Sequence, residues 1–126
     1  MSIEYIETEN APAAFGPFVQ GVRFENLVIT SGALPLHPSN GEFIGGDIKE
    51  QTRQTLDNLS AVLEAAGSSL KKVLLITVYM TDMDRFSEMN EVYASYFPGR
   101  CPARAAVGIS ALAKNAQIEM QAIAAR

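Results

Sequence analysis

The chain has 126 residues, 48% of them hydrophobic and 19% charged, which is typical of a globular protein and excludes a disordered or fibrous one. Ten Lys and Arg residues against fourteen Asp and Glu residues give a net charge of −4, so nucleic acid, whose binders usually present a basic patch, is disfavoured as a partner. The length predicts one domain over residues 1–126. The single cysteine excludes an intrachain disulfide, which favours a cytoplasmic protein. No apolar run reaches the ~18 residues that cross a bilayer, so we expect no membrane association.

The N-terminal third is predicted to form a hairpin and a long loop. Apolar runs at 19–24 and 27–31 flank a two-residue gap that contains Asn26, which favours a tight turn between two strands. The segment 32–47 is rich in glycine and proline. We expect a long connection there, which is functional or hides a short strand around 42–44.

A long amphipathic helix and an apolar strand are predicted next. Apolar residues recur at helical spacing from Ile48 onward, which predicts a helix. Asp47 is a suitable N-cap residue, and Gly67 is expected to end the helix. The run 73–80 is apolar and rich in β-forming residues on both faces, which predicts a central strand covered on both sides.

The last third is predicted to hold a second helix and two strands. The helix is expected over 86–97, capped by Asp82 or Asp84, and the strands over 104–109 and 117–124. This order of elements indicates an α+β fold with both helices on one face of the sheet, because two helices cannot cover both faces. A large exposed apolar face is unusual in a monomer, so the other face predicts a homo-oligomer.

Three polar residues interrupt this apolar pattern and are candidates for chemistry. Arg104 opens a strand, Glu119 lies in an otherwise apolar strand, and Asn90 occupies the apolar stripe of the second helix. An arginine binds a carboxylate bidentately, and a nearby glutamate can orient or deprotonate water, a combination that suits hydrolysis at a carbon beside a carboxylate. Spacing alone leaves open that Arg104 and Glu119 are surface residues and that Asn90 makes a structural hydrogen bond.

The usual cofactor and metal motifs are missing from the sequence. It contains no glycine-rich nucleotide loop, and its one histidine, His37, cannot form a multi-histidine zinc motif. We expect His37 to be a loop residue and Cys101 an inert thiol. The expected chemistry therefore needs no cofactor and no metal.

Short motifs are distributed along the chain, at residues 9–14, 16–21, 29–32, 54–58, 65–67, 102–104, 118–119 and 122–124. They resemble the motifs of the Rid family of reactive intermediate deaminases, also called YjgF or RidA proteins. They cover nearly the whole chain in order, and the chain is similar to the arginine-containing, RidA-like branch.

The resemblance implies a fold, an assembly and a reaction. The fold is a chorismate mutase-like, six-stranded mixed sheet with two helices packed on one face, assembled as a homotrimer with a cleft at each subunit interface. The reaction is the cofactor-free hydrolysis of enamine and imine intermediates, of the 2-aminoacrylate and 2-iminobutanoate type, to a 2-keto acid and ammonia.

The resemblance also assigns roles to individual residues. Arg104 matches the arginine that clamps the substrate carboxylate, and Glu119 matches the glutamate that positions the attacking water. Ser31, Gly32 and Asn90 match residues of the cleft wall or its hydrogen-bonded support.

The chain departs from the family pattern at several of these positions. Phe18 stands where the best-studied branch has tyrosine, which removes a hydroxyl and is expected to favour bulkier apolar substrates. Ala106 replaces the family cysteine, although its backbone carbonyl can still hold the water, and Cys101 is not the equivalent of that cysteine. Ala33 replaces a common glutamine.

Other functions remain open at this stage. The same cleft suits a deaminase of a pathway-specific enamine such as 2-aminomuconate. It equally suits a non-enzymatic, metabolite-binding or chaperone-like trimer. RNA cleavage, a label attached to parts of the family, is disfavoured by the acidic charge.

Overall fold

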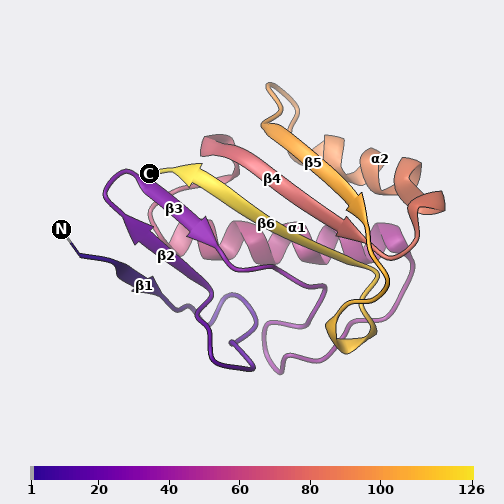
Figure 1. The fold of residues 1–126 in the computed structure, drawn as a ribbon, viewed down its shortest axis with the longest axis horizontal. Helices are drawn as coiled ribbons and strands as arrows, with labels where there is room; N and C mark the ends of the chain where they lie inside the picture. Colours follow the sequence, from indigo (N-terminus) through magenta and orange to yellow (C-terminus); the bar gives the residue numbers. More distant parts are fainter. Residues whose placement is uncertain (1) are drawn as a thin grey trace.

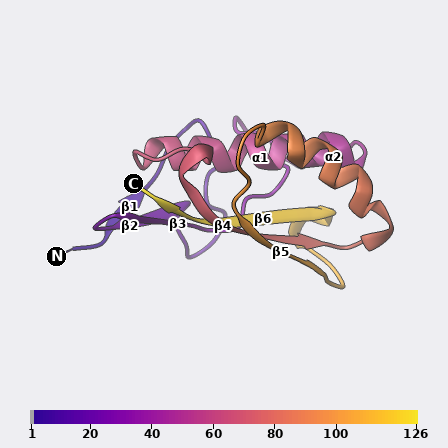
Figure 2. The same ribbon diagram turned by 90° about the horizontal axis from the view of Figure 1, so that it is seen from above.

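The computed structural model describes residues 2–126 and contains one six-stranded mixed sheet with two helices on one of its faces (Figures 1 and 2). The strands are β1 (Glu4–Ile6), β2 (Gly21–Phe24), β3 (Leu27–Thr30), β4 (Val73–Met80), β5 (Ala103–Gly108) and β6 (Ile118–Ala125), and the helices are α1 (Ile48–Ala65) and α2 (Phe86–Tyr96). Their order across the sheet is β1-β2-β3-β6-β4-β5, with β4 and β5 parallel and the other neighbours antiparallel. The predicted α+β architecture is confirmed.

The N-terminal region differs from the prediction in two places. The hairpin of β2 and β3 is confirmed, and its turn places Glu25 at a φ of 54°. The predicted strand at 42–44 is wrong, because Phe43 makes only an isolated bridge with Leu36. Strand β1 was not predicted, since it has three residues and only Ile6 is buried, which is too short for a periodic pattern.

Helix α1 follows the predicted caps and apolar stripe. The Asp47 carboxylate accepts a hydrogen bond from the Glu50 backbone N–H at 2.9 Å, which satisfies one of the free donors of the first turn. Gly67, just beyond the helix, has a φ of 84°, a conformation that favours glycine. The buried stripe of α1 packs on the central strands.

The core lies between the helices and one face of the sheet. Side chains of α1, β4 and β6 alternate into it, and those with no exposed surface include Leu56, Leu59, Leu63, Ile76, Val78, Met80, Ile118 and Met120. The opposite face is apolar but partly open, and Leu74 is 50% exposed and Ile29 43%. Both helices lie on one face, so within the single chain strand 73–80 is covered on one side, and the cover of its other face by a partner subunit stays a prediction.

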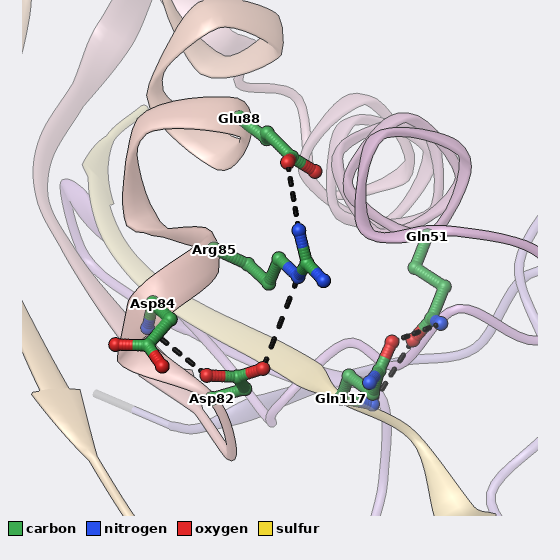
Figure 3. A network of polar contacts seen from close by, with 6 residues as sticks. All are labelled: Gln51, Asp82, Asp84, Arg85, Glu88 and Gln117. Carbon is green, nitrogen blue, oxygen red and sulfur yellow. Dashed lines mark hydrogen bonds and ion pairs between the residues drawn. The ribbon is translucent and has the colours of Figure 1, made fainter.

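Polar contacts fix the junction where β4 leads into α2 and where β6 begins (Figure 3). The buried Gln51 of α1 donates to the Gln117 side-chain oxygen at 2.9 Å and accepts from the Gln117 backbone N–H at 3.0 Å. Asp82 caps the 3-10 turn Met83–Arg85 rather than α2 itself. Arg85, the last residue of that turn, forms an ion pair with Glu88. These contacts set the start of the helix that carries Asn90.

Candidate functional site

Arg104 lies on β5 at the edge of the sheet and points toward α2. The parallel register pairs it with the fully buried Ile76 of β4, which places both residues on the helix-covered face. Its Nη1 donates to the Asn90 side-chain oxygen at 2.7 Å. The guanidinium carbon lies 4.8 Å from the ring centroid of Tyr93 and 5.4 Å from that of Phe86.

These contacts orient the guanidinium without neutralising it. Over residues 2–126, no aspartate or glutamate forms an ion pair with Arg104. Asn90 is uncharged, and the two aromatic rings hold the cation through their π faces. Ala106 lies two residues along β5 and shares the same face. We call Arg104, Asn90, Phe86, Tyr93 and Ala106 the arginine cluster, and its exposed guanidinium suits a carboxylate ligand.

Glu119 lies on β6 and points to the face without helices. It pairs with Tyr79, while its neighbours Ile118 and Met120 point into the core. The carboxylate is half-buried, and this burial raises the pKa of Glu119 above its usual range because it penalises the charged form. The residues around it form what we call the glutamate hollow: Phe15, Phe18, Ser31, Gly32, Leu34 and Ala113.

Gly32 is the position that allows Glu119 to adopt this orientation. A Cβ atom at Gly32 would lie 2.6 Å from the Glu119 carboxyl carbon and closer still to one of its oxygens. The glycine therefore provides the space in which the carboxyl group rests. Ser31, just before it, donates from its hydroxyl to the Val19 carbonyl at 2.5 Å, which ties the end of β3 to the preceding loop. Phe18 is 42% exposed at the rim.

The structure does not bring Arg104 and Glu119 together within one chain. They lie on opposite faces of the sheet, and β4 separates their strands. Strand register gives the two side chains opposite orientations, so one chain does not place a glutamate near the arginine, and their pairing across a subunit interface stays a prediction. The seven predicted site residues therefore form two sets, with Asn90 and Ala106 beside Arg104, and with Phe18, Ser31 and Gly32 beside Glu119.

Sequence reasoning missed three aromatic residues, Phe86 and Tyr93 beside Arg104 and Phe15 beside Glu119. Phe86 and Tyr93 were predicted only as the apolar stripe of the second helix, although their spacing around Asn90 puts all three on one helical face. Phe15, which contacts Phe18 edge to face with ring centroids 5.4 Å apart, carried no local signal. Cys101 is exposed and lies outside both sets.

Two further properties concern metals and membranes. Among the described residues, no group of three or more His, Cys, Asp or Glu side chains is arranged to hold a metal ion. Over residues 2–126, no helix is both long enough and apolar enough to cross a bilayer.

Comparison with known proteins shows a family match over almost the whole length. Residues 8–126 match the family described as endoribonuclease L-PSP. The chain is 51% identical to a RutC family protein of Pyrococcus horikoshii over 96% of each chain, and 44% identical to the 2-iminobutanoate/2-iminopropanoate deaminase of Escherichia coli, again over 96% of each.

Solved structures agree with this match. The Escherichia coli YjgF gene product superposes with a TM-score of 0.93 at 43% identity, and covers 98% of each chain. Escherichia coli TdcF, solved with bound serine, gives a TM-score of 0.93 at 40% identity and the same coverage. Together with relatives named as deaminases, these likenesses support a Rid-type deaminase, and the chain belongs to the endoribonuclease L-PSP family, also known as the YjgF/RidA family.

Proposed function

We propose that this protein is a cofactor-free deaminase that hydrolyses 2-imino acids and their enamine tautomers, of the 2-iminobutanoate and 2-aminoacrylate type, to 2-keto acids and ammonia. The observation that carries the proposal is the half-buried Glu119, whose carboxyl group rests against Gly32 in a hollow and has a raised pKa. A carboxylate of raised pKa is a stronger base, which suits the activation of water at near-neutral pH. The E. coli relative is named for this reaction.

In the proposed reaction the arginine cluster binds the substrate and Glu119 transfers protons. Arg104 binds the substrate carboxylate, and Asn90 holds the guanidinium in place from α2. At the imine carbon, the oxygen of water forms the new C–O bond as Glu119 takes one of its protons. The imine enters protonated at nitrogen, and as the C–O bond forms the C=N π electrons move to that nitrogen, which becomes a neutral amine. Glu119 then returns its proton to the amine, ammonia leaves with the C–N bond electrons, and the Glu119 carboxylate takes the hydroxyl proton as the C=O double bond of the keto acid forms. Glu119 releases that proton to water before the next turnover.

The complete site requires two copies of the chain. Arg104 and Glu119 face opposite sides of one sheet, so each would meet its counterpart on a neighbouring subunit. A homotrimer in which the helix-free faces pack together would cover the exposed Leu74 and Ile29. In a cyclic assembly every interface is the same, so three equal clefts result, each with Arg104 of one subunit and Glu119 of the next.

The family description also names ribonuclease activity, which the charge of the chain disfavours. The net charge is −4, and phosphate binding depends on clustered basic residues. RNA cleavage is therefore included in the test as a competing outcome.

The direct test is turnover of an imine made in situ. A threonine dehydratase releases 2-iminobutanoate, and 2-ketobutanoate formation is followed with and without the purified protein, with spontaneous hydrolysis subtracted at several buffer concentrations. We expect a rate proportional to protein concentration, and no cleavage of a single-stranded RNA incubated in parallel. Absence of acceleration, or RNA cleavage that is lost in Glu119→Gln, would contradict the proposal.

The composition of the cleft is tested by mixing two inactive variants. Arg104→Ala and Glu119→Gln subunits are co-expressed with different tags, and assemblies that carry both are purified. In each trimer that carries both variants, about one third of the clefts combine an intact Arg104 with an intact Glu119 from the neighbour, so activity well above either variant alone is expected. If both residues acted within one chain, mixing would restore nothing.

A further inference from the structure

A second cavity adjoins the glutamate hollow on its helix side. We call it the loop cavity. Its walls are the N-terminal segment 11–20, the segment 30–36 that follows β3, and Asn58, Leu59 and Val62 of α1. Five of its residues also line the glutamate hollow, namely Phe15, Phe18, Ser31, Gly32 and Leu34. The two spaces therefore meet beside Gly32, where the Glu119 carboxyl group rests.

The loop cavity has room for a few carbon atoms. The cavity has an accessible volume of ≈ 40 Å³, whereas one water molecule needs about 10–15 Å³. The space is thus larger than a single methyl group requires.

Two polar side chains that line the cavity have all their hydrogen-bonding groups occupied. The buried Gln20 accepts from the Thr8 backbone N–H at 2.6 Å, and its amide donates to nearby backbone carbonyls of the N-terminal segment. The buried Asn58 donates to the carbonyls of Leu34 and Leu36, both at 2.9 Å, and its oxygen accepts from a neighbouring glutamine of α1. Both amides serve to fix the walls of the cavity.

The two hydroxyl groups of the lining are likewise used by the framework. Ser31 donates to the Val19 carbonyl, and Thr30 accepts from the Ala122 backbone N–H at 3.0 Å. The remaining lining side chains are apolar. A polar group that entered would lose its hydrogen bonds to water without gaining new ones, so the cavity favours an apolar occupant.

The aromatic rings at the mouth of the cavity are held by contacts of their own. Phe15 packs edge to face on Phe18, and the Lys114 ammonium lies 4.7 Å from the centroid of the Phe15 ring. Lys114 also donates to the Gly41 carbonyl at 2.9 Å. This chain of contacts keeps the two rings over the shared boundary of the loop cavity and the glutamate hollow.

We propose that the loop cavity is the subsite for the substrate side chain, and that this protein prefers 2-imino acids with a branched or medium-sized apolar side chain over those with a methyl group. The inference rests on the proposed deaminase function. With the reacting carbon beside Glu119, the side chain attached to that carbon would reach past Gly32 under Phe15 and Phe18. A leucine-derived imine would place its isobutyl group in the cavity, whereas a methyl group leaves most of it empty.

The test compares two imines made by one enzyme. D-amino-acid oxidase with catalase converts D-leucine to 2-imino-4-methylpentanoate and D-alanine to 2-iminopropanoate, and keto acid formation is measured for each above its spontaneous rate. We expect kcat/KM to be about tenfold or more higher for the larger imine, because extra methylene groups in an apolar pocket give discrimination of this order.

Two matched substitutions locate the preference in the cavity. Ala13 lines the loop cavity and Ala14 does not, and both are exposed in the same segment, so neither change disturbs the core. Ala13→Leu is expected to lower the ratio of kcat/KM between the two imines to about one by filling the cavity, while Ala14→Leu keeps the ratio of the parent. An equal loss of the ratio in both variants, or no loss in Ala13→Leu with an unchanged circular dichroism spectrum, would overturn the proposal.

Equilibrium binding separates this inference from the deaminase proposal. If the parent accelerates neither imine, the proposed function fails, and the subsite is then read from the affinities of 4-methyl-2-oxopentanoate and pyruvate measured by calorimetry. Tighter binding of the larger keto acid that disappears in Ala13→Leu supports the subsite. Equal affinities, or no binding of either, refute it.

Discussion

The arginine cluster and the glutamate hollow differ in how far their charged side chains are exposed to solvent. Arg104 lies exposed on an edge strand, where an amide and two aromatic rings orient its guanidinium. Glu119 lies half-buried on a central strand, and over residues 2–126 no basic side chain forms an ion pair with it. One charge is kept in solvent and oriented, and the other is partly withdrawn from solvent.

This difference matches the two tasks that the proposed reaction requires. A binding group must be charged before the ligand arrives, and an exposed arginine meets that requirement at no desolvation cost. A group that takes and returns a proton must change its charge during the reaction, and burial brings the pKa of Glu119 closer to neutral pH. The fold keeps the two environments apart by placing them on opposite faces of one sheet.

The largest expected effect comes from removing the titrating group. Glu119→Gln keeps the shape of the side chain but cannot accept a proton, and we expect kcat to fall by about 10²–10⁴, the usual contribution of a general base. The parent should lose activity as the pH falls through the raised pKa of Glu119, because the carboxylate becomes protonated. This acidic limb of the pH profile should be absent from the residual activity of the variant. A variant with parent kcat and parent pH profile would show that Glu119 is structural.

Removing the exposed charge should affect mainly the affinity for substrate. Arg104→Ala is expected to lower kcat/KM roughly 10- to 150-fold, since a hydrogen bond to a charged group contributes about 1.5–3 kcal/mol. Arg104→Lys restores the charge without the planar fork and should recover only part of this loss. Steady-state kinetics should show the change chiefly in KM. Full recovery by lysine would mean that charge alone, and not the bidentate geometry, binds the carboxylate.

Most of the fold could be predicted from local sequence patterns. The apolar stripe of α1, its Asp47 cap and the strands of the sheet follow from periodicity, which the packed core preserves. Strand β1 has only three residues, and the bridge at Phe43 involves a single pair, so neither leaves a periodic pattern. Elements of this length depend on tertiary contacts.

The candidate site was predicted residue by residue, but its arrangement was not. Arg104 and Glu119 each interrupt an apolar pattern, which made them visible in the sequence. Their relative orientation depends on the register between β4 and its two neighbours, which a one-residue shift would reverse. The contact between Gly32 and Glu119 joins residues far apart in the chain, and the resemblance placed Gly32 only in the cleft wall.

That contact offers an indirect way to disturb the glutamate hollow alone. Gly32→Ala would place a Cβ atom 2.6 Å from the Glu119 carboxyl carbon, so the flexible carboxyl end must move. We expect kcat to fall roughly 10- to 100-fold, because a displacement of about 1 Å costs up to 10² in rate, whereas KM should change little. Gly99→Ala is the matched control, since its added Cβ would have no neighbour within 4 Å. Equal kinetics for Gly32→Ala and the parent would show that Glu119 needs no fixed position.

The smallest expected effect is that of Glu119→Gln on stability. The substitution lowers kcat, but it should make the fold more stable near neutral pH. Because burial raises the pKa of Glu119 in the folded state, the fold binds its proton more tightly than the unfolded chain does. The resulting stabilisation is complete below the unfolded value of about 4.3 and is lost as the pH rises through the folded pKa. Glutamine does not titrate, so Glu119→Gln should match the parent most closely near pH 4.

Near pH 7 the variant should therefore melt at a higher temperature than the parent. Thermal unfolding followed by circular dichroism between pH 4 and pH 8, at one fixed subunit concentration, measures this difference. Glu7→Gln removes an exposed carboxylate and serves as the control, whose melting curve should follow that of the parent. A melting difference that is constant across the pH range would contradict the linkage, because only a group with different pKa values in the folded and unfolded states makes stability depend on pH.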